Sequence, residues 1–247
     1  MVRSLLVRGM LVGLAAGVLA FAFAFIFGEP QIQKAIDYED SLAGPGHEVV
    51  SRGVQRTLGL LTGTVVMGVA LGGLFSLVFA WAYGRVGDLS ARATSALLAG
   101  AAFLTITAIP FTKYPANPPT VGNPDTIDKR TMLFLAMIAI TVLAAIAATR
   151  IRRDLLNRTS AWNATLLATA AFIATIAIAQ MILPAVHETP PGFPADVLYR
   201  FRLASLGINL TLWTTIGLGF GALAEKLIAE RQHALTTGPK RVGGLTH

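Results

Sequence analysis

The sequence has 247 residues, of which 54% are hydrophobic and only 13% are charged, and its formal net charge at pH 7 is +7. Its mean hydropathy of +0.63 is too high for a soluble domain of this length, because one core cannot bury so much apolar surface. The absence of cysteine excludes disulfides, thiolate metal sites and thiol nucleophiles. The composition therefore predicts a protein whose solvent is largely the lipid bilayer.

Six long runs without Asp, Glu, Lys or Arg follow one another along the chain. A helix needs about 20 mainly apolar residues to cross the hydrocarbon core, and each run reaches or approaches that length. We therefore expect an all-α polytopic membrane protein with about six transmembrane helices. The first run is too long for a signal peptide and lacks a small-residue cleavage site, so we expect it to be retained. The runs are Gly9–Gly28, Thr57–Gly84, Ala93–Phe111, Thr131–Thr149, Ser160–Val186 and Leu203–Ala224.

The charges between these runs are distributed unequally. The segments on the side of the two chain ends carry twelve basic and four acidic residues, whereas the opposite segments carry eight basic and nine acidic residues. Lys and Arg collect on the cytoplasmic side of membrane proteins, so both chain ends are predicted to be cytoplasmic, in a bacterial inner membrane. This topology accounts for the positive net charge, and no nucleic-acid surface is expected.

The connections suggest one transmembrane domain, residues 1–228, followed by a disordered cytoplasmic tail, residues 229–247. Most of the 12 prolines lie in the outer connections or at the helix ends that enter them. Proline stiffens the backbone, so we expect these outer loops to be ordered and to pack on one another. The loops are residues 29–56, 112–130 and 187–202.

Two further patterns concern how the helices pack. Residues 96–109 and 165–178 are identical at eight of fourteen positions, which leaves two interpretations open: three helical hairpins repeated in parallel, or three ordinary hairpins of similar composition. Gly9, Gly13 and Gly17 recur at every fourth residue, and several later glycine pairs share this spacing. Small residues let helix backbones approach closely, so this pattern predicts a tightly packed bundle.

Acidic residues and two of the four histidines gather in the outer loops. Imidazole and carboxylate ligands together suit divalent cobalt, nickel, zinc or iron. His47 and Glu48 from the first loop, His187 and Glu188 from the third, and Glu29 form our candidate metal site. The alternative is that these residues only solvate surface loops, since their spacing matches no compact metal motif.

The apolar runs hold no ionisable residue, so an ion crossing the membrane would have to use neutral oxygen or sulfur groups. No zinc-protease, serine-hydrolase or P-loop motif is present, and we expect neither enzymatic activity nor ATP hydrolysis by this chain. We expect no resident cofactor. The neutral groups at membrane depth are Thr105, Thr107, Asn163, Thr165, Gln180, Asn209, Thr214, Thr215, Met67, Met137 and Met181.

Several longer motifs resemble the CbtA family of cobalt transporter subunits, and the resemblance extends from residue 1 to about residue 225. They lie mainly in the outer loops and at the helix ends that border them. The motifs read GEPQI at 28–32, HEVVSR at 47–52, YPANPP at 114–119, ETP at 188–190 and LYRFRLASLG at 198–207.

This resemblance implies a membrane subunit for cobalt uptake that works with a small single-helix partner similar to CbtB, which carries a histidine-rich end. Many family members have a histidine-rich first outer loop, whereas residues 41–48 of this chain contain His47 alone. That departure shifts metal capture toward the partner. The second hypothesis is a non-transporting accessory or scaffold subunit of a larger membrane complex, which the uncharged membrane interior favours.

Overall fold

A computed structural model describes residues 2–43, 50–85, 87–186 and 188–237. Throughout these ranges every regular element is helical. Six helical segments are long and apolar enough to cross a membrane, which confirms the predicted all-α class and the number of spans. The spans are Val2–Leu42, Arg52–Ala82, Ala91–Lys113, Ile127–Leu156, Ala161–Ile182 and Ala195–His233.

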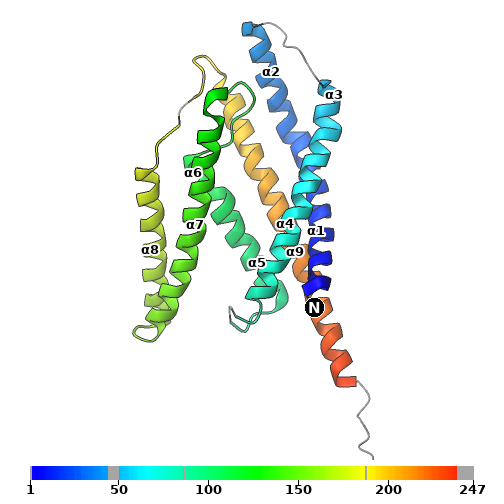
Figure 1. The fold of residues 1–247 in the computed structure, drawn as a ribbon, viewed down its shortest axis with the longest axis vertical. Helices are drawn as coiled ribbons and strands as arrows, with labels where there is room; N and C mark the ends of the chain where they lie inside the picture. The colour runs from blue at the N-terminus through cyan, green and yellow to red at the C-terminus, as the bar shows by residue number, and fades with distance from the viewer. Residues whose placement is uncertain (1, 44–49, 86, 187, 238–247) are drawn as a thin grey trace, which may run out of the picture.

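The first three spans are each built from several consecutive helical elements, and the last three from one helix each. The start of α1 and the end of α9 lie toward one end of the molecule, which we call the terminal end (Figure 1). The elements are α1 (Val2–Phe23), η1 (Ala24–Gly28), α2 (Glu29–Ala43), α3 (Arg52–Val54), η2 (Gln55–Gly59), α4 (Leu60–Ala82), α5 (Ala91–Ala102), η3 (Phe103–Ala108), α6 (Ile109–Lys113), η4 (Pro124–Thr126), α7 (Ile127–Leu156), α8 (Ala161–Ile182) and α9 (Ala195–Thr237).

The structure corrects three predicted boundaries. More than half of the predicted loop 29–56 is helical, because α2 continues directly from the first span. The other two corrections concern α9, which begins inside the predicted loop 187–202 and runs to Thr237, inside the predicted disordered tail. The extension at its end is rich in Ala, Glu, Leu and Arg, which are strong helix formers. Residues 238–247 of the tail lie outside the described residues.

Two of the spans change to π-helix just before a proline. The residues that precede Pro30 and Pro110 are Glu29 and Ile109, and their backbone N–H groups donate five residues back, to Ala24 and Leu104. Proline lacks an N–H and clashes with the carbonyl four residues earlier, and a π-turn moves that carbonyl aside without ending the helix. At Pro184 the fifth span instead stops, with α8 ending at Ile182.

The closest helix contact joins α1 and α4 through glycines, as the small-residue spacing predicts. A Cβ atom added to Gly13 would lie 2.1 Å from the carbonyl oxygen of Gly68, and one added to Gly72 would lie 2.2 Å from that of Gly9. No side chain fits at these positions, so the two backbones touch directly. Gly63 of α4, by contrast, has open space where a side chain would project.

The remaining spans assemble in two groups. Helix α9 packs on both α1 and α5, and the shared core contains Phe75, Phe79, Trp213 and Phe220. Helices α7 and α8 pack on each other and stand to one side of α1, α4 and α9 (Figure 1). Within the α5–α9 contact the buried Ser95 hydroxyl donates to the Gly217 carbonyl at 2.7 Å.

The glycine contact leads to a stability prediction. The Gly13→Ala substitution should lower the melting temperature of the purified protein, because its Cβ has no space against the α4 backbone, at a cost of about 1–3 kcal/mol. Gly63→Ala is the matched control, since its Cβ meets no other atom within 4 Å and alanine favours helix. Equal melting temperatures for the two variants would contradict a backbone-to-backbone seam.

The orientation predicted from charge is testable by cysteine labelling, because the chain has no native cysteine. Ser41 is an exposed residue near the end of α2, and Asn157 is exposed in the turn between α7 and α8 at the terminal end. With cytoplasmic chain ends, an impermeant maleimide should label Ser41→Cys in intact cells and Asn157→Cys only after permeabilisation. The reverse pattern would show the opposite topology.

Candidate functional site

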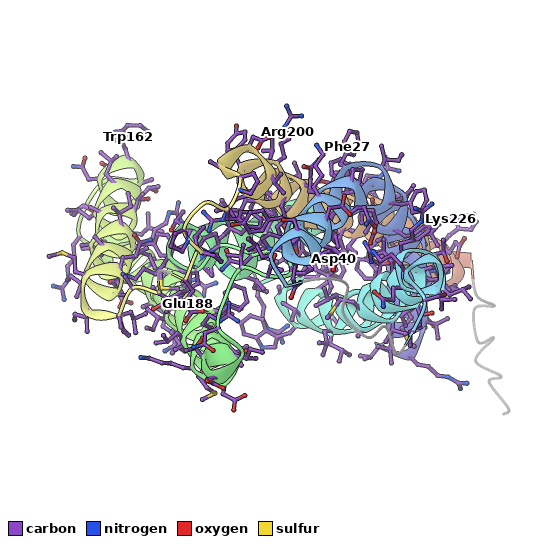
Figure 2. All side chains as sticks on the ribbon, turned by 90° about the horizontal axis from the view of Figure 1, so that it is seen from above. Phe27, Asp40, Trp162, Glu188, Arg200 and Lys226 are labelled. Atoms are coloured by element: carbon purple, nitrogen blue, oxygen red, sulfur yellow. The ribbon has the colours of Figure 1, made fainter. Side chains whose placement is uncertain are left out.

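Three segments pack together at the end of the molecule opposite the terminal end: α2, residues 112–130 and residues 188–202. We call these segments, together with Arg52 that pairs with Glu29, the crown. Figure 2 looks down on this end, with Asp40 on α2, Glu188 before α9 and Arg200 on α9. A small apolar core of Ala35, Val121, Phe193 and Val197 joins α2 to the second and third outer loops. Tyr38 packs edge-on against Phe193 with ring centroids 5.2 Å apart and donates its hydroxyl to the Pro191 carbonyl at 3.3 Å. The apolar contacts and the hydrogen bond hold the outer loops against one another.

Glu29 lies at the junction of η1 and α2 and is nearly buried. Nη2 of Arg52, at the start of α3, donates to one Glu29 carboxylate oxygen at 2.5 Å. The same guanidinium donates through Nε to the side-chain oxygen of Gln33 at 3.3 Å. A charge-assisted pair with both partners largely shielded from water is strong, and it neutralises the carboxylate. The Glu29 side chain also lines a hollow of about 140 Å³, with Ser205 and apolar residues of η1, α4 and α9.

Glu188 lies in the third outer loop and is bound to the second. Its carboxylate accepts the backbone N–H of Asn123 at 3.0 Å and lies 3.5 Å from Nε of Arg130. The Thr126 hydroxyl and the Asn123 amide, followed by the Arg130 charge, lower the pKa of Glu188 below the ordinary 4.5. The carboxylate is therefore ionised at neutral pH and links the two loops.

The five candidate metal ligands divide into two groups. Glu29 and Glu188 are described, and each is paired with a different arginine. His47, Glu48 and His187 lie outside the described residues. In the part of the chain that the structure describes, no group of three or more His, Cys, Asp or Glu side chains is arranged to hold a metal ion. The predicted metal site thus stays a prediction.

The neutral groups at membrane depth differ in exposure: some are buried, some are exposed, and Gln180, Asn209 and Thr215 are half-buried. Thr105 and Thr107 of η3 and Met137 of α7 are buried where η3 packs between α7 and α9, and the Thr107 hydroxyl lies 3.5 Å from the Asn209 side-chain oxygen. We call this contact the polar seam. Asn163, Thr165, Thr214, Met67 and Met181 are exposed on the outside of the bundle.

Sequence reasoning missed several polar residues that the structure buries. Ser76, Thr94, Ser95 and Thr141 are all less than 5% exposed. Ser76 and Thr141 donate to carbonyls of their own helices, and Ser95 donates across to α9. Their identity alone gave no signal, since a hydroxyl in an apolar run is as compatible with a lipid face as with a core.

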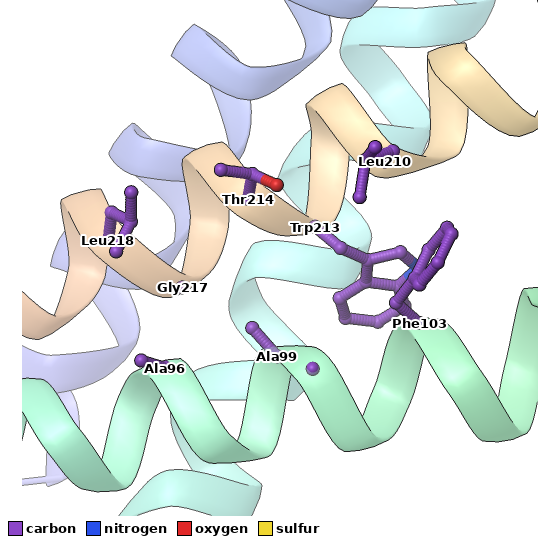
Figure 3. A pocket seen from close by; sticks show the side chains of 9 residues that line it. Ala96, Ala99, Phe103, Leu210, Trp213, Thr214, Gly217 and Leu218 are labelled. Atoms are coloured by element: carbon purple, nitrogen blue, oxygen red, sulfur yellow. The ribbon is translucent and has the colours of Figure 1, made fainter.

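A second hollow, of about 190 Å³, opens between α5 and α9 (Figure 3). Phe103 and Trp213 form its largest walls, and small residues such as Ala96 and Gly217 form its floor. Thr214 contributes the only side-chain oxygen of its lining. Because oxygen, nitrogen or sulfur ligands are needed to hold a metal ion, this hollow is unsuited to one.

The observations above define the class of the protein as a polytopic helical membrane protein with an ordered, charge-paired crown. Residues 2–225 match the family model of CbtA, described as a probable cobalt transporter subunit, and the chain belongs to this family. The same comparison therefore confirms the resemblance noted in the sequence. No curated protein and no solved structure matches the chain significantly.

The contacts of Glu188 predict how stability depends on acid. The pKa of Glu188 is lowered in the folded state. The ionised carboxylate therefore stabilises the fold at pH values above its ordinary pKa of 4.5, and this stabilisation is lost as the pH falls through the lowered folded-state pKa. Glu188→Gln should lower the melting temperature at pH 7. It should also make the melting temperature fall less than that of the unmodified protein when the pH is lowered below 4.5. Glu39→Gln, at an exposed position of α2, is the control. Identical melting profiles for both variants across this pH range would refute a stabilising role.

Proposed function

We propose that the chain is the membrane subunit of a divalent metal uptake system, with cobalt as the transported ion, in a bacterial inner membrane. The observation that carries this proposal is the CbtA family match over residues 2–225. The family description "subunit" supports a second component, and we propose a small single-helix protein similar to CbtB. We also propose that the chain has no enzymatic activity of its own, since its sequence contains no zinc-protease, serine-hydrolase or P-loop motif.

The proposed first contact of the ion is the crown. Glu29, His47, Glu48, His187 and Glu188 provide carboxylate and imidazole ligands of the kind that Co²⁺ accepts. Arg52 and Arg130 neutralise the two described carboxylates, so an arriving cation has to compete with a guanidinium for each. This competition supports transient binding at the crown, with high-affinity capture assigned to the partner.

The proposed route beyond the crown uses neutral groups. Thr105, Thr107 and Asn209 along the polar seam offer oxygens where three spans meet. Neutral oxygens replace hydration water without holding a divalent ion tightly, and ions pass through channels and carriers by way of such weak sites.

One observation favours the alternative of an accessory or scaffold subunit. The hydroxyl of Thr105 donates to the Ala101 carbonyl of its own helix, and the amide of Asn209 donates to Ser205. Side chains satisfied within their own helices serve packing as well as they serve a path. An accessory subunit should co-purify with its host complex, whereas a transport subunit should support uptake with its small partner alone.

Uptake of radioactive Co²⁺ by cells that lack the native gene tests the proposal directly. The His47→Ala/His187→Ala variant should lose most uptake while still inserting in the membrane, because two imidazole ligands are removed. Uptake by the unmodified protein should fall as the pH drops through about 6.5, where histidine becomes protonated and ceases to ligate. His233→Ala, near the end of α9, is the matched control.

Unchanged uptake in the double histidine variant would overturn the metal-binding role of the crown. Absence of uptake by the unmodified chain together with its partner would overturn the transport proposal. In that case co-purification with a larger membrane complex would establish the accessory role.

A further inference from the structure

The terminal end of the molecule brings together arginines from two turns. Arg153 of α7 donates to the backbone carbonyl of Arg85, in the turn between α4 and α5, at 3.0 Å. The contact places the α7–α8 turn beside the α4–α5 turn. Together residues 85–92 and 150–158 contain six arginines, against the two aspartates Asp88 and Asp154. Only Arg92 among the six forms an ion pair within the described residues, with Glu225 of α9.

One face of α7 extends this basic group into the membrane. Leu143, Ile146, Arg150 and Arg153 are spaced by three, four and three residues, which places them on one stripe of the helix. The opposite face of α7 packs on α8. On the stripe, Leu143 is 64% exposed and Ile146 is 45% exposed, and both arginines are exposed. The stripe is therefore apolar at membrane depth and cationic where the helix leaves the membrane.

The neighbouring span leaves this stripe uncovered. Helix α7 packs on η3 and α6, but it makes no extensive contact with α5 within the described residues. In Figure 1, α5 and α7 diverge toward the terminal end. Trp81 on α4 is 69% exposed and lies beneath the Arg85 guanidinium, 6.0 Å from it. Tryptophan and arginine mark the depth of lipid headgroups, so the basic part of the stripe lies at that level.

We propose that this stripe binds one anionic glycerophospholipid, with its phosphodiester between Arg150 and Arg153 and an acyl chain along Leu143 and Ile146. Guanidinium groups bind phosphate oxygens through paired, charge-assisted hydrogen bonds, and basic sites between transmembrane helices select anionic headgroups. Inorganic phosphate satisfies only the polar half of the stripe. A zwitterionic lipid satisfies the apolar half but brings a cation to the arginines. The combination of both halves selects an anionic phospholipid, independently of any metal transport.

Native mass spectrometry of the purified full-length protein tests this assignment. The protein should retain added phosphatidylglycerol more strongly than phosphatidylcholine. Arg150→Gln/Arg153→Gln should weaken phosphatidylglycerol retention about tenfold, since two headgroup cations are lost, and leave phosphatidylcholine retention unchanged. The control, Arg3→Gln/Arg231→Gln, removes the same charge from exposed positions at the same end and should retain the lipid.

Two further variants separate lipid binding from folding, since Arg153 also joins the two turns. Arg150→Gln alone should weaken phosphatidylglycerol retention while the melting temperature in detergent stays unchanged. Arg153→Lys, which keeps the charge, should retain most of the phosphatidylglycerol that the unmodified protein retains. Equal loss in the control pair would reduce the effect to overall charge and overturn the site. Equal retention of the two lipids would also overturn it, as would displacement of phosphatidylglycerol by millimolar inorganic phosphate.

Discussion

The direct backbone contact between α1 and α4 is the constraint on which much of the remaining packing depends. Gly9 and Gly13 meet Gly68 and Gly72 with no space for a side chain, and in lipid such van der Waals contact is a main source of helix association. Both helices continue without a break into their outer segments, so their approach also brings Glu29 within reach of Arg52. The best-shielded ion pair of the crown is therefore positioned by a glycine seam inside the membrane.

Pro30, Pro110 and Pro184 mark where three spans either change to π-helix or end. Before Pro30 and Pro110 the chain stays helical by adopting a π-turn, and the helix then continues into the crown. At Pro184 the helix ends, and Glu188 lies outside any helix, where it contacts Asn123 and Arg130. One residue type thus produces two outcomes, and the difference decides which outer segments are rigid extensions of the bundle and which are loops bound to it.

The number of spans and the glycine seam were predictable from the sequence, because charge spacing and small-residue periodicity depend on local composition. The helical state of α2 was not predicted, since its charged residues suggest a loop once the membrane limit is passed. The sequence also did not predict which spans pack against each other. A helix in a soluble protein has a polar face that shows which side is buried, whereas an apolar helix in lipid has none. For the candidate site, the sequence supplied the residue types, whereas the pairing of Glu29 with Arg52 and of Glu188 with Arg130 depends on tertiary contacts.

The charge balance of the crown bears on how a metal subunit of this kind could work. Carboxylates without arginine partners in the crown would bind a divalent ion tightly. The apolar runs contain no charged residue that could attract the ion further into the membrane. Arg52 pairs with Glu29 and Arg130 pairs with Glu188, so in the proposed metal-binding role an arriving ion would displace a guanidinium, which would return when the ion leaves. In that proposal, the exchange would lower the affinity of the crown for the ion toward the weak binding expected of the neutral oxygens in the polar seam. An ion that moves between sites of similar, low affinity does not first have to dissociate from a tightly binding site. Under this mechanism the selectivity for a particular metal has to come from imidazole ligands, either His47 and His187 or those of a partner.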